Sequence, residues 1–185
     1  MRYETIGDIY STNATIRERL LAILNGISSE QAAMREGEDG WSVAEIAEHL
    51  SMVDAGALRI CSRLLDAGRA SGTVSDGPLV LSEGFGDKLA KVAGVKIEAP
   101  ERVRPRGEAS VEDSLAKLKE SRAALDLLRD DLERYDLAGH AFPHPVFGDL
   151  NAAEWMIVLG GHEARHTDQI QRILSTHQTA GVSPA

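Results

Sequence analysis

Two histidines spaced four residues apart give the strongest chemical signal in this chain of 185 residues. They are His162 and His166, in the run H-E-A-R-H. On a helix this spacing puts both imidazoles on one face, about 6 Å apart along the axis at 1.5 Å per residue. Neutral imidazole binds zinc, nickel, iron and copper, so the pair predicts two ligands of one metal ion.

The same run matches the H-E-x-x-H motif of zinc proteases, in which Glu163 would be the general base. Two features disfavour a protease. The glutamate lies one position off the histidine face, and the following T-D-Q contains no further histidine. We also expect no good strand to edge a peptide-binding cleft. A metal-dependent hydrolase remains an alternative.

A third ligand must come from another helix, and His49 is the natural candidate. It lies in the run W-S-V-A-E-I-A-E-H-L and flanks the apolar side of a predicted helix, beside Ile46 and Val53. Three histidines from two helices would leave coordination positions open for water or substrate, as in catalytic zinc sites. The alternative is a boundary histidine whose ring bonds to a carbonyl.

Four stretches of helical periodicity must position these residues. Three of them begin with a residue pair typical of a capping box: Ser42 with Glu45, Ser110 with Asp113, and Asn151 with Glu154. In the last stretch, the two histidines share a narrow sector with apolar residues and are expected to point into the bundle. The predicted helices cover about residues 8–25, 42–68, 110–132 and 151–175.

The predicted fold is all-α, an up-down four-helix bundle with a long crossover between the second and third helices. The crossover, residues 68–109, is rich in glycine and proline, and we expect a short helix over 82–92 within it. No β-hairpin is expected. Residues 1–177 are predicted to form one domain, and residues 178–185 a flexible tail.

Composition narrows the classes of partner. The chain has 29 acidic and 20 basic residues and a net charge of -9, which disfavours binding to nucleic acid or to an anionic membrane. The single cysteine, Cys61, excludes an internal disulfide. No signal peptide or transmembrane stretch is evident, so we expect a cytoplasmic protein.

The run around His49, together with G-G-H-E-A-R-H-T-D-Q-I, resembles the DinB-like (YfiT-type) metal-binding superfamily. The resemblance extends from the first helix to about Leu174. It implies a metal held by His49, His162 and His166, and often a homodimer. Known members include bacillithiol transferases and a mycothiol-dependent isomerase.

The resemblance therefore favours a metal-dependent thiol S-transferase in conjugation or detoxification, with zinc or nickel and a low-molecular-weight thiol as cosubstrate. A metal would stabilise a thiolate or lower the pKa of bound water. Glu163 would accept a proton or orient an imidazole, and Gln169 would reach the site. Arg104, in a basic patch with Arg102 and Arg106, is the candidate for binding a small-molecule substrate, while His140 and His144 would edge the pocket. A non-catalytic sensor or stress-response module, and a bundle whose histidines merely pack, are the alternatives.

Overall fold

Long helices packed side by side make up the body of the molecule. The computed structural model describes residues 3–75, 77–92, 94–95 and 97–180, and residues 177–180 as backbone only. Helix α1 packs against α7 and α5, and α3 packs against the same two helices. This arrangement confirms the predicted four-helix bundle. The long helices are α1 (Ile6–Leu24), α3 (Val43–Ser71), α5 (Val111–Asp126) and α7 (Ala152–Ala180).

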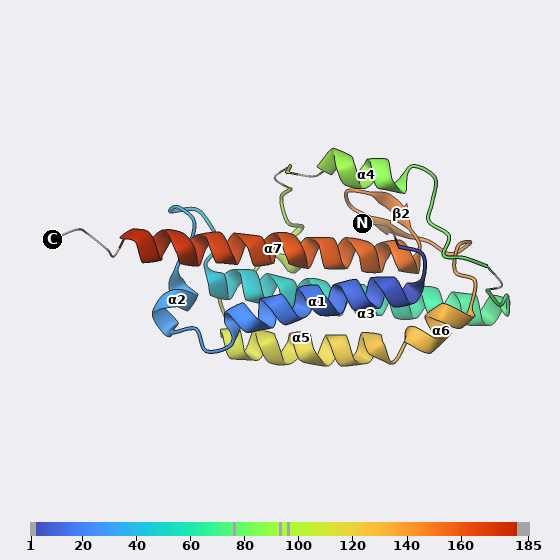
Figure 1. The fold of residues 1–185 in the computed structure, drawn as a ribbon, viewed down its shortest axis with the longest axis horizontal. Coiled ribbons are helices and arrows are strands. Elements are labelled where there is room, and N and C mark those ends of the chain that lie inside the picture. Colours follow the sequence, from blue (N-terminus) through green and yellow to red (C-terminus); the bar gives the residue numbers. More distant parts are fainter. Residues whose placement is uncertain (1–2, 76, 93, 96, 181–185) are drawn as a thin grey trace.

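Helices α1 and α7 run in one direction, and α3 and α5 run in the other (Figure 1). Because α3 and α5 are parallel, the chain between them must return along the whole bundle. Residues 72–110, which we call the connection, do this. Of the described helices, none has the length and apolar character needed to cross a membrane.

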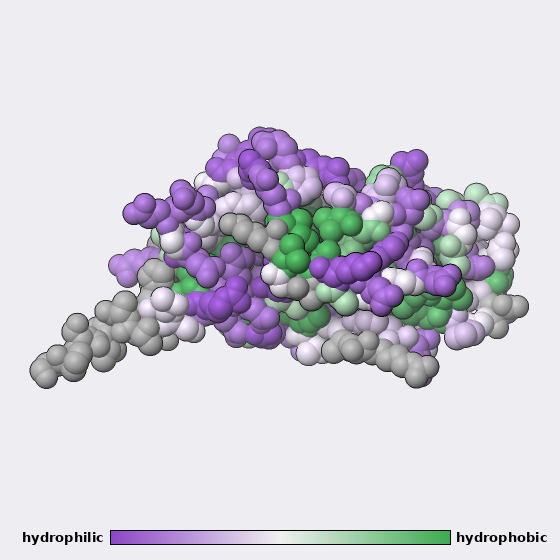
Figure 2. All heavy atoms as spheres, turned by 90° about the horizontal axis from the view of Figure 1, so that it is seen from above, coloured by the Kyte–Doolittle hydropathy of each residue, from purple (hydrophilic) through white to green (hydrophobic). Residues whose placement is uncertain are grey.

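Short helices and two short strands lie around the bundle. The connection holds one α-helix and one 3-10 helix, and Figure 2 looks down on the face that carries it. There, apolar side chains gather near the middle among hydrophilic ones. The short elements are α2 (Ser29–Ala33), α4 (Phe85–Val92), η1 (Glu101–Val103), α6 (Arg129–Arg134), β1 (Phe142–His144) and β2 (Gly148–Leu150).

The capping pairs start the helices as predicted. Glu45 donates its backbone N–H to the Ser42 hydroxyl, and the Glu45 carboxylate accepts from the Ser42 N–H. Reciprocal bonds also join Ser110 to Asp113 and Asn151 to Glu154. These pairs satisfy backbone donors that a helix start would otherwise leave free.

Two predicted helix ends were wrong. Helix α3 ends at Ser71 and not at Gly68, and it is capped by Gly72, which adopts the left-handed conformation at φ 68°. Gly68 instead permits close packing, because a Cβ there would lie 2.2 Å from Leu137 Cδ2. At the other end of the chain, α7 extends to Ala180, beyond the predicted end at 175 and into the predicted tail. Residues 181–185 lie outside the described residues.

The third predicted helix is broken in two. Leu128 N–H bonds to the Leu125 carbonyl three residues back, and the Tyr10 hydroxyl donates to the same oxygen at 2.7 Å. This tight turn separates α5 from α6 and leaves Leu127 83% exposed.

The β-hairpin was not predicted. Strands β1 and β2 pair antiparallel over three residues each, with Phe142 opposite Leu150. Such short strands, with Pro143 inside one of them, do not show the alternation that marks a strand in a sequence.

A layer of buried polar groups lies between two apolar clusters of the core, at the middle of the bundle. At its centre, Arg17 of α1 donates Nε to Glu163 Oε1 at 2.7 Å and Nη2 to Glu163 Oε2 at 2.6 Å. Nη2 also donates to Asp54 Oδ2 at 2.7 Å, and Nη1 donates to the Leu118 carbonyl at 2.8 Å. One guanidinium therefore binds α7, α3 and α5. Arg17, Asp54 and Glu163 are each at most 4% exposed.

We predict that Arg17→Met destabilises the protein by about 3–5 kcal/mol, because it leaves two buried carboxylates without their cation. The free energy of unfolding in urea measures this. Arg19→Ala is the matched control, since Arg19 pairs with Asp168 at the surface and such pairs contribute about 1 kcal/mol or less. Equal losses in the two variants would contradict the role assigned to Arg17.

Candidate metal centre

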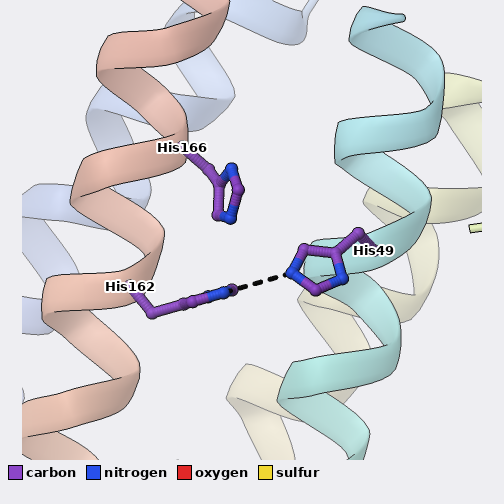
Figure 3. Close-up of side chains that lie close together, drawn as sticks. All are labelled: His49, His162 and His166. Carbon is purple, nitrogen blue, oxygen red and sulfur yellow. Dashed lines mark hydrogen bonds between the residues drawn. The ribbon is translucent and has the colours of Figure 1, made fainter. Parts of the chain in front are cut away.

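Three histidine side chains meet between α3 and α7 (Figure 3). His49 comes from α3, and His162 and His166 come from successive turns of α7. Each offers a ring nitrogen, and these nitrogens lie within 4.8 Å of one another. His49 is buried, whereas the rings of His162 and His166 are partly exposed. The structure thus brings together the three residues predicted as ligands, in a group able to hold a metal ion.

The ring of His49 is oriented by the connection. Its Nδ1 donates to the Val103 carbonyl at 2.6 Å, so in the neutral ring Nε2 carries a free lone pair. Nε2 lies 3.1 Å from His162 Nε2. His49 therefore has the carbonyl bond of a boundary histidine and also presents a ligand atom. The two interpretations of its sequence position are compatible.

His166 is oriented from its own helix. Its Nδ1 lies 2.8 Å from Gln169 Oε1, and donation to that oxygen leaves Nε2 free for a metal. Trp41 packs beside the site, with its ring centroid 4.8 Å from that of His49 and 6.3 Å from that of His166. Gln169 thus reaches the site through a histidine.

Two features of the His162 ring bear on whether the site fits a metal ion. Its Nδ1 is buried and has no hydrogen-bond partner among the described residues. In a tetrahedral zinc site, each nitrogen ligand lies about 2.0–2.1 Å from the ion, so two such ligands lie about 3.3 Å apart. The Nε2 atoms of His49 and His162 are 3.1 Å apart, which is close to that separation. Two neutral imidazoles at this distance satisfy one lone pair at most, whereas an ion satisfies both. The donor set fits a divalent transition metal.

Burial keeps these rings neutral. It lowers the pKa of His49 and lowers that of His162 well below the ordinary 6.5. It also lowers the pKa of His166 to about 4, and the charges of His49 and Arg165 act in the same direction. A neutral ring is the form that binds metal, so the environment favours ligation at neutral pH.

Glu163 has a different partner from the one expected. The histidine pair was predicted at the centre of the buried face of α7, but Glu163 and Thr167 occupy that position, 2% and 0% exposed. The histidines lie at its edge, because α7 packs against α1 on one side and α3 on the other. Both Glu163 oxygens accept from Arg17, so a role of this carboxylate in proton transfer stays a prediction without support from its geometry.

The remaining candidates differ in their contacts. Arg104 is engaged by Glu98 at 2.6 Å and Glu101 at 3.6 Å on the exposed connection. His144, on β1, packs its ring 4.9 Å from Trp155, and its charge would act on His162. His140 lies in the turn before β1, where its N–H bonds to the Leu137 carbonyl.

Comparison with known proteins identifies the family. The family model of the DinB superfamily matches residues 13–170. The chain belongs to the DinB superfamily.

The match includes all of α3 and the part of α7 up to Ile170, and these two segments carry the three histidines. The chain is 26% identical over 156 residues to the uncharacterized protein YuaE of Bacillus subtilis, covering 81% of this chain and 87% of that protein. The crystal structure of TT2238, a four-helix bundle protein, superposes with a TM-score of 0.59 at 22% identity. That match covers 91% of this chain and 99% of the other. It supports the fold alone.

Three contributors to the site were missed. Val103 acts through its backbone carbonyl, which no sequence pattern reveals. Trp41 packs beside two of the histidine rings, and its place in the same run as His49 was a usable signal. Arg17 was overlooked although it has helical spacing with Leu20 and Leu24 on the buried face of α1.

We predict that the metal-free protein loses stability as the pH falls from 6.5 towards 4. The folded-state pKa values of the three histidines lie below 6.5, so the unfolded chain binds more protons in this window. Their contribution is complete above pH 6.5. Urea midpoints of metal-free protein at pH 7.5, 6 and 5 measure the loss.

The matched variant is His166→Gln, which removes one of these titrations and leaves the carboxylates unchanged. Its midpoint should fall less steeply between pH 6.5 and 5 than that of the wild type. An identical slope would argue against the burial assigned to His166.

Proposed function

We propose that His49, His162 and His166 hold one divalent transition metal ion, zinc or nickel, and that the protein is a metal-dependent thiol S-transferase acting in conjugation or detoxification. The observation that carries the metal site is the convergence of two Nε2 atoms at 3.1 Å from antiparallel helices. The Nδ1 bonds of His49 and His166 support it, because they leave Nε2 free in each ring.

An ion at this position would supply charge that lowers the pKa of a thiol or water. Three nitrogen ligands leave coordination positions for a substrate, which favours a catalytic over a structural site. The partial exposure of His162 and His166 supports this, because a substrate could approach the ligands from solvent.

The residues around the ligands maintain the geometry. Val103 and Gln169 each fix the tautomer of one ring. Trp41 packs beside two of the rings and restricts their rotation. In the transfer step, the thiol loses its proton to solvent and its sulfur forms a bond to an electrophilic carbon. The leaving group departs from that carbon with the bonding electron pair.

We predict about one metal ion per chain in the wild type and loss of bound metal in His49→Ala, His162→Ala and His166→Ala. Gln169→Leu should weaken metal binding about 10–100-fold, because it removes the acceptor that orients His166. Elemental analysis after dialysis and competition with a chelator measure these effects.

The control is Gln171→Leu on the same helix, since Gln171 bonds to Arg19 at the surface and should leave the affinity unchanged. Wild-type metal content in all three histidine variants would refute the site. Absence of metal from correctly folded wild type would favour histidines that merely pack.

We predict that the metal-loaded protein forms thioethers from low-molecular-weight thiols and electrophilic carbon compounds. Mass spectrometry of a panel of thiols and acceptors detects the conjugates, with His162→Ala as the metal-free control. Metal binding without any conjugate would favour a non-catalytic module. Hydrolysis of the acceptor without thiol would favour a hydrolase.

A further inference from the structure

The charged groups of the connection differ in whether they are already engaged. The carboxylate of Glu48, next to His49, accepts from the Gly107 N–H at 2.9 Å. Glu98 and Glu101 pair with Arg104. These contacts leave Arg104, the predicted substrate-binding residue, occupied by acidic partners.

Arg102 is different. Its side chain is exposed, and within the described part of the chain it has no ion-pair partner. The adjacent residue, Val103, bonds to His49, which fixes the backbone of Arg102 next to the site. Burial and then the charge of Arg102 lower the pKa of His144 on β1. Within the described structure, Arg102 is therefore an exposed cation without an acidic partner, next to the residue that orients His49.

A second cation borders the ligands on α7. Arg165 immediately precedes His166 and donates Nη2 to the Val95 carbonyl of the connection. Its charge acts on both His162 and His166. The nearby Glu163 carboxylate is paired with Arg17, which it shares with Asp54. Two arginines, Arg102 and Arg165, are thus close in sequence to the groups that form the site, in a protein of net charge -9.

We propose that this site selects substrates carrying a carboxylate or a similar anionic group, and that Arg102 binds that group while the reacting atom faces the three histidines. The inference rests on the proposed function and specifies its substrate class. A guanidinium presents two parallel N–H donors to a carboxylate, which gives orientation as well as attraction. Arg165 adds positive potential, although its bond to Val95 already commits one donor nitrogen.

The test compares two small thiols that differ in charge. Mercaptoacetate and 2-mercaptoethanol are titrated separately into cobalt(II)-loaded protein, and the thiolate-to-cobalt absorption band reports binding. Arg102→Ala should reduce the ratio of the two affinities about tenfold relative to wild type. Arg102→Lys should retain part of the preference, and raising the salt concentration should reduce it in the wild type. Comparing ratios between variants cancels the intrinsic difference between the two thiols.

Arg106→Ala is the matched control, because Arg106 is an exposed arginine of the same connection. It should keep the wild-type ratio. An unchanged ratio in Arg102→Ala, or an equal loss in Arg106→Ala, would overturn the inference while leaving the proposed function intact. Failure to bind cobalt would instead refute the metal site. Binding of cobalt but of neither thiol would refute thiol transfer, and the inference with it.

Discussion

The guanidinium of Arg17 joins the four helices of the bundle at one level. It belongs to α1 and binds Glu163 of α7, Asp54 of α3 and the Leu118 carbonyl of α5. Charges removed from water are tolerated only with well-placed partners, so the helices cannot slide along one another without breaking these bonds. Glu163 follows His162 directly, and Asp54 lies little more than one turn beyond His49. The contact that sets the register of the helices therefore also sets the separation of the ligands.

The apolar core and the histidine site depend on this layer in different ways. Apolar clusters above and below it supply most of the buried surface, and their side chains tolerate small shifts. Ring nitrogens that are to bind one ion would not tolerate such shifts. Gly160 contributes here, because a Cβ at this position would lie 2.0 Å from Asn13 Oδ1, so α1 can approach α7 closely. Ligands on helices held this firmly are largely positioned before any ion arrives.

The sequence was most informative where one local pattern determines the result. Capping pairs located the starts of α3, α5 and α7, and the i, i+4 spacing identified two of the three histidines that meet in the structure. Prediction failed where contacts between segments distant in the sequence determine the local structure. The break after Asp126 depends on a hydroxyl from α1, and the position of the histidines depends on how α7 divides its surface between α1 and α3. Arg17 is a charged residue on the buried face of a helix, and such a residue indicates a buried ion pair with another element. An analysis based only on the periodicity of apolar residues misses this signal.

The hydrogen bonds that attach the connection to the helices around the site use its own main chain, while its Phe85 packs in the core. His49 bonds to a carbonyl at Val103, Arg165 to a carbonyl at Val95, and Glu48 to the N–H of Gly107. The side chains in these contacts all come from the helices. The exposed residues of the connection can consequently differ without breaking these bonds. Evolution or design can exchange its side chains, and with them what the molecule recognises, while the bundle and its ligands stay as they are.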